Sequence, residues 1–128
     1  MAEVWTAATG MARERTRRRD FPDAFIVPLT APDLPAATAL FPRVQPLEVE
    51  LGCGRGRFLL ARARRHPQVN FLGVDRFLLR LRKLDLKLLA AGLRNVRLVH
   101  GDAVEACRRL LPPETVSACY ILFPDPWP

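Results

Sequence analysis

The sequence predicts an α/β fold built on a parallel β-sheet, and three observations support this. From Leu47 onward, short apolar stretches of strand character alternate with longer stretches of helical periodicity. A glycine cluster follows the first strand, and acidic residues end the next two. Alternating strands and helices form right-handed βαβ units, and such folds bind their ligands beyond the carboxyl ends of the strands.

The predicted elements follow one another without long gaps. Strands are predicted at 47–51 (LEVEL), 69–75 (VNFLGVD), 96–102 (VRLVHGD) and 116–123 (VSACYILF). Helices are predicted at 57–66, 76–92 and 103–111. One face of the long second helix is expected to enter the core, through Phe77, Leu81, Leu84, Leu88 and Ala91. Gly92 stands where a C-terminal glycine belongs. The fourth strand is nearly all apolar, as expected for a parallel strand covered on both faces.

The first 46 residues give weaker indications of secondary structure. Residues 1–20 include the basic run RERTRRR and are interpreted as a mobile tail, with an arm that contacts phosphate as the alternative. Residues 21–46 contain six prolines and are expected to form an irregular lead-in that packs on the domain. Residues 47–128 are then expected to form the ligand-binding half of a domain.

Charge and composition narrow the classes of function. The net charge of +7 and the pI near 10.6 favour an anionic partner such as nucleic acid. An arginine-rich coding bias is the alternative, because 18 of the 20 basic residues are Arg. No apolar run is long enough for a membrane span and no secretory signal is visible, so a cytoplasmic location is expected.

The cysteines and histidines do not suggest a metal site. Cys53, Cys107 and Cys119 are odd in number and contain no C-x-x-C spacing. They are interpreted as buried small hydrophobic residues in a reducing compartment. His66 and His100 lie far apart and offer no ligand spacing, so no metal is expected.

The glycine cluster limits the ligand that the first strand can hold. The segment ELGCGRGRF contains Gly52, Gly54 and Gly56, which allow a tight turn and close approach to bare backbone. It lacks the Gly-Lys-Ser/Thr of a P-loop and the G-x-G-x-x-G spacing of a dinucleotide site. Glu50 would repel phosphates but suits a ligand with positive charge. S-adenosylmethionine is such a ligand, with an amino group, a sulfonium, a ribose and an adenine.

Acids at three successive strand ends match the donor groups of that molecule. Glu50 suits its positive charge, Asp75 can accept hydrogen bonds from both ribose hydroxyls, and Asp102 can accept from the adenine amino group. Each acid alone has an ordinary alternative as a loop carboxylate or helix cap, and Asp102 is well placed as a cap. The ordered set therefore predicts the ligand, whereas a single G-x-G-x-G is weak evidence.

The chain resembles the bacterial tRNA (guanine-N(7)-)-methyltransferase family of class I methyltransferases. The segments VELGCGRGRFLLARARRHPQVNFLGVDR, GLRNVRLVHGDAVE and FPDPWP carry the resemblance, which covers residues 47–128. It implies a Rossmann-like three-layer sandwich with strand order 3-2-1-4-5-7-6, of which this chain has only the first four parallel strands and an open edge at the last. It also implies that Glu50, Asp75 and Asp102 bind S-adenosylmethionine and that Asp125 is the active-site acid. Many members have Glu where this chain has Asp75.

The resemblance further implies methyl transfer to N7 of a guanine in the variable loop of tRNA. Guanine N7 carries a free lone pair, so no general base is needed. Asp125 can stabilise the positive charge that develops on the purine and accept from the N–H edge of guanine. Pro124 and Pro126 fix the backbone around it. Trp127 can stack on the target base, or alternatively cap the core beside Phe123.

Two alternatives to an active tRNA methyltransferase follow from the pattern. Members of the family continue past this tryptophan with a Lys/Arg/His-rich segment and three further strands, which this chain lacks. A truncated, inactive remnant that binds S-adenosylmethionine or RNA without turnover is the first alternative, and a partner chain could instead complete the sheet. The second alternative is an amino-methyltransferase, but those enzymes have an Asp/Asn-Pro-Pro-aromatic turn, whereas here the turn is Pro-Asp-Pro-Trp.

Overall fold

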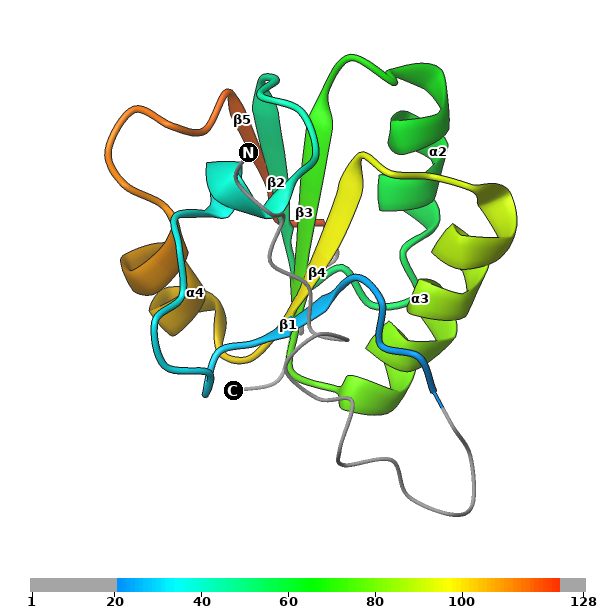
Figure 1. The fold of residues 1–128 in the computed structure, drawn as a ribbon, viewed down its shortest axis with the longest axis horizontal. Coiled ribbons are helices and arrows are strands. Elements are labelled where there is room, and N and C mark those ends of the chain that lie inside the picture. Colours follow the sequence, from blue (N-terminus) through cyan, green and yellow to red (C-terminus); the bar gives the residue numbers. More distant parts are fainter. Residues whose placement is uncertain (1–20, 123–128) are drawn as a thin grey trace.

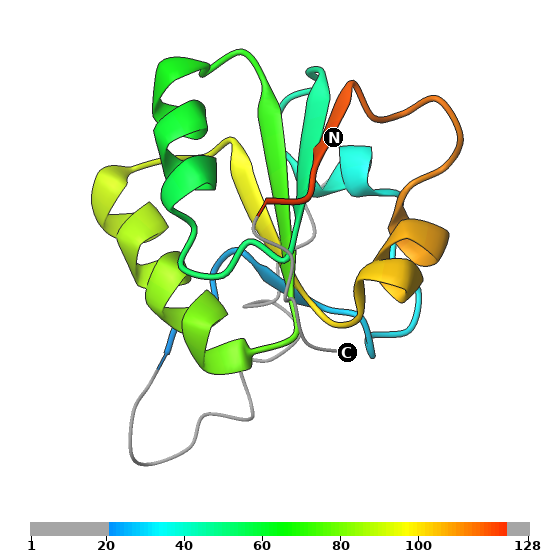
Figure 2. The ribbon, with the colours of Figure 1, turned by 180° about the vertical axis from the view of Figure 1, so that it is seen from behind.

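A computed structural model describes residues 21–122 and shows one β-sheet with helices on both faces (Figure 1; Figure 2). The strands are β1 (Ile26–Pro28), β2 (Leu47–Leu51), β3 (Asn70–Asp75), β4 (Val96–His100) and β5 (Ala118–Tyr120). The helices are the 3-10 helix η1 (Ala37–Leu40), α2 (Arg57–Arg65), α3 (Leu78–Ala91) and α4 (Ala103–Leu110). The described chain is therefore the three-layer α/β sandwich that the sequence predicts.

All strand pairs in the sheet are parallel, in the order β1-β4-β3-β2-β5. The four predicted strands lie in the expected order, with β5 at one edge beside β2. The expectation of only four strands was wrong, because β1 from the proline-rich lead-in pairs with β4, with Ile26 opposite Leu98. β1 spans three residues, which is too short for an alternating pattern to be visible in the sequence.

Buried charged side chains attach the lead-in to the rest of the fold. The carboxylate of Asp85 in α3 accepts hydrogen bonds from the backbone N–H groups of Ala24 (3.0 Å) and Phe25 (2.8 Å). Arg97 in β4 donates to the carbonyl of Leu40 at 2.9 Å, and its guanidinium lies 4.9 Å from the centre of the Phe25 ring. These contacts join segments about 60 residues apart in the sequence, which explains why local patterns did not reveal β1.

The core has two layers, one on each face of the sheet. α2 and α3 cover one face, while α4 and η1 cover the other (Figure 1; Figure 2). The first layer contains Ile26, Cys53, Leu59, Ala63, Phe71, Leu81, Leu84, Leu88, Val96 and Leu98. The second contains Val27, Leu29, Ala37, Leu40, Phe41, Leu47, Val49, Leu72, Val74, Val99, Ala106 and Leu110. β3 contributes side chains to both layers, as a strand covered on two faces must.

The prediction that one apolar face of α3 is buried is correct only for the middle of the helix. The three central leucines of that face are buried, but Phe77 is 59% exposed and Ala91 is also exposed. The prediction for Phe77 was wrong because α3 begins at Leu78, which leaves Phe77 in the extended N-cap position outside the helix. Gly92 ends the helix with φ of +66° and its N–H donates to the last turn, as predicted.

The edge strand β5 is less covered than its apolar sequence predicts. Within the described residues it pairs only with β2, Cys119 is exposed and Ile121 is 61% exposed. The expectation of cover on both faces was therefore wrong for the described part of this strand. Of the three cysteines, only Cys53 is fully buried, while Cys107 is partly buried. Among residues 21–122, no helix is long and apolar enough to cross a membrane.

Candidate cofactor-binding site

The carboxyl ends of β2, β3 and β4 meet at the lower edge of the sheet in Figure 1. Glu50 lies near the end of β2, Asp75 ends β3, and Asp102 follows β4 before α4 begins. The strand register places Glu50 opposite Gly73 and Asp75 opposite His100. The parallel sheet thus brings the three predicted acids to one edge, as the sequence analysis expected.

The glycine loop between β2 and α2 is held against the end of β3. The N–H groups of Gly52 and Cys53 both donate to the carbonyl of Val74, at 2.7 and 3.0 Å. Gly52, Gly54 and Gly56 all have positive φ, at +75°, +55° and +74°, a region that other residues rarely adopt. A Cβ added at Gly52 or Gly54 would meet nothing within 4 Å, so the space beside this part of the loop is open.

Gly56 serves a different purpose from the other two glycines. A Cβ at this position would collide with the side chain of Leu84, so its absence allows the loop to pack against α3. Gly56 is also the N-cap residue of α2, and no side chain accepts hydrogen bonds from the first turn of that helix. The first-turn amides of α2 therefore keep the capacity to donate to a polar ligand.

Asp75 connects the glycine loop to the start of α3. It is only 7% exposed, its Oδ2 accepts from the N–H of Gly54 at 2.8 Å, and its Oδ1 accepts from the N–H of Phe77 at 2.8 Å. Each carboxylate oxygen has a second lone pair, so the group retains the capacity to accept from a ligand. The predicted ribose acceptor therefore also shapes the loop, which the sequence analysis did not anticipate.

Glu50 is a buried carboxylate with an incomplete set of partners. Its side chain is 4% exposed, and its Oε1 has no hydrogen-bond partner within the described chain. Burial, with a smaller contribution from the nearby charge of Asp75, raises the pKa of Glu50 to about 7. A buried acceptor without a donor is costly, and a cationic donor from a ligand would satisfy it.

Cys53 lies beneath the same loop and is not a candidate nucleophile. Burial, followed by the charges of Asp75 and Glu50, strongly raises the pKa of its thiol, so the thiolate is disfavoured. The side chain packs over Gly73 of β3, where an added Cβ would lie 2.9 Å from the Cys53 sulfur. This cysteine therefore has a packing role, as predicted from its sequence context.

Asp102 is the helix cap that the sequence analysis gave as its ordinary alternative. It is exposed, and its Oδ2 accepts from the N–H groups of Val104 (3.0 Å) and Glu105 (3.1 Å) at the start of α4. Its Oδ1 makes no hydrogen bond to any residue from 21 to 122. One oxygen is thus committed to the helix, and the other is free to accept from a ligand.

Two exposed apolar side chains flank the acids and were not predicted as site residues. Phe77 stands two positions after Asp75 and Val104 two positions after Asp102, and they are 59% and 58% exposed. Their position beside the strand-end acids gives the site apolar surface suited to a ring system. The sequence signal that could have identified Phe77 and Val104 is an apolar residue two positions after each of these two aspartates.

The two predicted residues of the FPDPWP segment lie outside the described residues. These are the catalytic Asp125 and the base-stacking Trp127, so their positions stay predictions. The strand that precedes them is described: β5 runs beside β2, with Tyr120 in register with Glu50. β5 therefore leads toward the edge of the sheet that carries the acids.

Comparisons with known proteins agree with this geometry. Residues 44–128 match the model of a protein family described as "Putative methyltransferase". Three similar curated proteins carry the name tRNA (guanine-N(7)-)-methyltransferase. The protein from Nitrosococcus oceani is 42% identical over 90 residues, covering 70% of this chain and 38% of that relative. The protein from Hydrogenovibrio crunogenus is 43% identical over 89 residues, covering 69% of this chain and 37% of that relative.

The third relative extends the match toward the N-terminus. The protein from Mycobacterium avium is 32% identical over 123 residues, covering 91% of this chain and 48% of that relative. The chain thus spans less than half the length of these curated relatives. The matched residues include the glycine loop and all three strand-end acids. The chain belongs to this methyltransferase family, as the resemblance of its glycine loop and strand-end acids led us to expect.

Proposed function

We propose that the chain transfers a methyl group from S-adenosylmethionine to N7 of a guanine in tRNA, and that residues 47–128 form its cofactor-binding part. The observation that carries the proposal is the buried Glu50 carboxylate, whose Oε1 lacks a partner beside an open glycine loop. The names of the relatives support the substrate. Because the chain spans 38% of the first of them, the activity of a whole enzyme is part of the proposal.

The residues present fit S-adenosylmethionine better than a phosphate-bearing cofactor. This molecule supplies an electrophilic methyl group on a sulfonium. Glu50 would accept from its amino group, which provides the missing partner for Oε1 and favours the charged carboxylate. Asp75 would accept from the ribose hydroxyls with its remaining lone pairs, while it keeps the Gly54 loop in place. Two carboxylates at this edge would oppose a pyrophosphate.

The purine of the cofactor would lie at the ends of β3 and β4. The free Oδ1 of Asp102 would accept from the adenine amino group, while Oδ2 continues to cap α4. Phe77 and Val104 would contact the faces of the ring and lose exposed apolar surface. Burial of their side chains is favourable by about 25 cal/mol for each Å² removed from water.

The guanine would be held by the FPDPWP segment, by the resemblance of that segment to the family. Guanine N7 needs no deprotonation, so the enzyme supplies mainly proximity and orientation, worth up to about 7–11 kcal/mol in favourable systems. Asp125 would stabilise the positive charge that develops on the purine, and Trp127 would stack on the base. Modification of tRNA would place the protein in the cytoplasm.

The experiment that tests the proposal is methyl transfer from labelled S-adenosylmethionine to an unmodified tRNA transcript. This chain would be compared with its Asp125→Asn variant and with the full-length Nitrosococcus oceani relative, which controls for the quality of the transcript. We expect this chain to label the tRNA, and the labelled tRNA should be cleaved by chemistry specific for 7-methylguanosine. The Asp125→Asn variant should lose most of the methyl transfer but retain cofactor binding. Cofactor binding without transfer would instead identify an inactive binding module, and absence of cofactor binding would contradict the proposal.

A further inference from the structure

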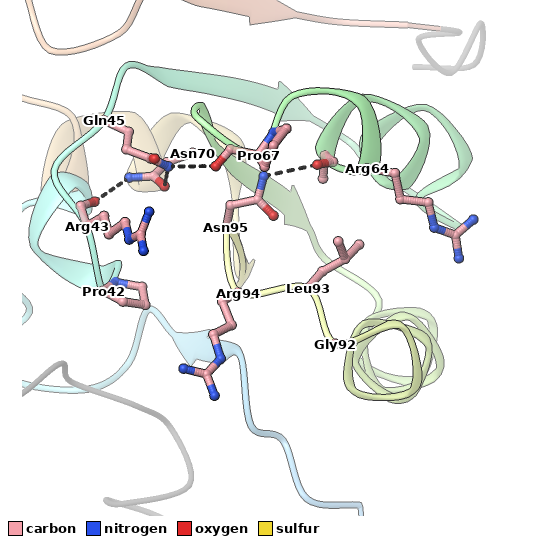
Figure 3. Close-up of a pocket in the computed structure, with 11 residues that line it drawn as sticks. Pro42, Arg43, Gln45, Arg64, Pro67, Asn70, Gly92, Leu93, Arg94 and Asn95 are labelled. Carbon is pink, nitrogen blue, oxygen red and sulfur yellow. Dashed lines mark hydrogen bonds between the residues drawn. The ribbon is translucent and has the colours of Figure 1, made fainter.

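A cavity lies at the end of the sheet opposite the strand-end acids, where β3 and β4 begin. It has a volume of about 320 Å³ and is shown in Figure 3. Three segments form it: the end of the lead-in, the turn between α2 and β3, and the turn between α3 and β4. Its lining residues are Pro42, Arg43, Gln45, Ala63, Arg64, Pro67, Asn70, Gly92, Leu93, Arg94 and Asn95.

Two buried asparagines give this cavity a fixed shape. The amide nitrogen of Asn95 donates to the carbonyls of Ala63, His66 and Val69, at 3.2, 3.1 and 3.0 Å. Asn70 donates to the carbonyl of Arg43 at 2.8 Å and accepts from the side chain of Gln45 at 2.8 Å (Figure 3). These bonds fasten all three segments to one another, so the cavity is formed before any ligand arrives.

The charge around the cavity is entirely positive. Its lining includes three arginines and no acidic residue. Within residues 21–122, none of the three makes an ion pair, whereas Arg62 and Arg82 each hold a carboxylate. Figure 3 shows the Arg43 side chain extending into the space between Pro42 and Asn95. Arginines that line a cavity without carboxylates favour an anionic ligand whose oxygens can accept from a guanidinium, such as a phosphate.

An apolar cavity adjoins the basic one. It measures about 420 Å³ and shares with it Pro42, Gly92, Leu93 and Arg94. Its remaining lining residues are Phe25, Leu88, Leu89 and Arg97. Leu89 is 42% exposed, so apolar surface is accessible there. Together these two adjoining cavities, here called the groove, offer a basic part and an apolar part, which match the phosphate and the base of a nucleotide.

We propose that this groove binds a nucleotide unit of an RNA strand, with the phosphate on Arg43 and Arg94 and the base against Leu89 and Leu93. The inference rests on the proposed function for the identity of the RNA as tRNA. The groove lies at the amino ends of the strands, so it is separate from the cofactor site at their carboxyl ends. A folded tRNA is larger than this domain and can contact both edges. A free nucleotide has the same chemistry, and the experiment distinguishes the two.

The test uses the whole chain and a fluorescently labelled tRNA transcript, with binding followed by anisotropy at several salt concentrations. The double variant Arg43→Ala/Arg94→Ala removes two exposed side chains from the groove. Lys83→Ala/Lys87→Ala is the matched control, because it removes two exposed charges from α3 that do not line the groove. We expect the first variant to weaken tRNA binding about tenfold and to reduce the salt slope by about 0.7–0.9, since the groove holds one phosphate and each phosphate contact contributes that amount.

The control variant should change the affinity by less than about threefold, as expected for a general loss of charge. Equal weakening in both variants, or no binding of tRNA by the wild-type chain, would overturn the inference. Binding of guanosine monophosphate, measured in parallel, tests whether the groove takes a free nucleotide instead. If binding of guanosine monophosphate depends on Arg43 and Arg94 while binding of tRNA does not, the assignment of RNA as the ligand is wrong. Groove-dependent tRNA binding without cofactor binding would leave the inference standing and would refute the proposed function instead.

Discussion

The backbone N–H of Gly54 donates a 2.8 Å hydrogen bond to Oδ2 of Asp75, which joins the loop after β2 to the end of β3. The other oxygen of Asp75 holds the N–H of Phe77 at the start of α3. One carboxylate thus fixes the loop that would cradle the cofactor and the apolar side chain that would contact its purine. Asp75 therefore has a structural role in addition to its predicted role in ribose binding.

Replacement of Asp75 should affect both roles. In Asp75→Ala, two partly buried backbone N–H groups lose a charged acceptor, which should cost about 1–3 kcal/mol of unfolding free energy. The affinity for S-adenosylmethionine, measured by calorimetry, should fall at least tenfold. Asp75→Glu keeps a carboxylate, and it should retain more affinity than Asp75→Ala. Unchanged affinity in the alanine variant would remove the ribose role.

Glu50 should make the ligand-free protein less stable as the pH rises. Its pKa is about 7 in the folded protein against an ordinary value of 4.5, so between these values the folded state binds more protons than the unfolded state. The unfolding free energy therefore decreases from pH 4.5 to 7 by up to about 3 kcal/mol, because each pKa unit corresponds to about 1.4 kcal/mol. Denaturation with urea at pH 5 and pH 8 measures this slope. Glu50→Gln should reduce it and stabilise the protein at pH 8; an identical slope in the variant would contradict the assignment.

Gly56 and Gly92 provide a matched pair for separating backbone strain from steric overlap. Both have positive φ, at +74° and +66°, but only Gly56 has a neighbour, Leu84, where a Cβ would stand. Gly92→Ala should cost about 1–2 kcal/mol from the left-handed backbone alone. Gly56→Ala should cost about 1–3 kcal/mol more, because the added Cβ would overlap the buried side chain of Leu84. Equal losses in urea denaturation would show that Leu84 adapts.

Asp85 should be among the most sensitive positions for stability, although it lies far from the acids of the cofactor site. It is fully buried, accepts from two backbone N–H groups of the lead-in, and partly offsets the buried charge of Arg97. Asp85→Ala should lower the unfolding free energy by about 2–6 kcal/mol, because two backbone N–H groups lose their acceptor, at about 1–3 kcal/mol each, and the buried Arg97 loses a nearby opposite charge. Amide exchange at Ala24 and Phe25 should accelerate. Glu105→Ala, which breaks an exposed pair with Arg108, is the control and should have a far smaller effect.

Local patterns in the sequence were sufficient to predict the central part of the fold. The strand at Leu47–Leu51 has the predicted bounds, and Gly92 ends its helix as expected, because both signals depend on neighbouring residues. The acids at the strand ends were also predictable, since parallel strands bring their carboxyl ends to one edge. The strand β1 was not predictable from local patterns, because it is stabilised by contacts with Asp85 and Arg97, which lie in distant parts of the chain.

The exposure of individual side chains was harder to predict, because it depends on the residue at which each helix begins and on which faces of each strand are covered. Phe77 fits the helical period but precedes the first residue of α3, so the pattern alone placed it in the core. Cys119 has an apolar neighbourhood in the sequence, yet it is exposed because β5 is an edge strand. The second role of Asp75 could not be predicted, because its partner Gly54 is 21 residues away and donates through the backbone.

The most direct test of the account is the calorimetric titration of S-adenosylmethionine into the chain near pH 7, in two buffers with different ionisation enthalpies. We predict binding to a single site, with release of part of a proton as the amino group of the ligand meets Glu50, whose pKa near 7 leaves it partly protonated beforehand. The Glu50→Gln variant should bind at least tenfold more weakly and release no proton. Absence of binding, or binding that is unchanged in the variant, would contradict the account.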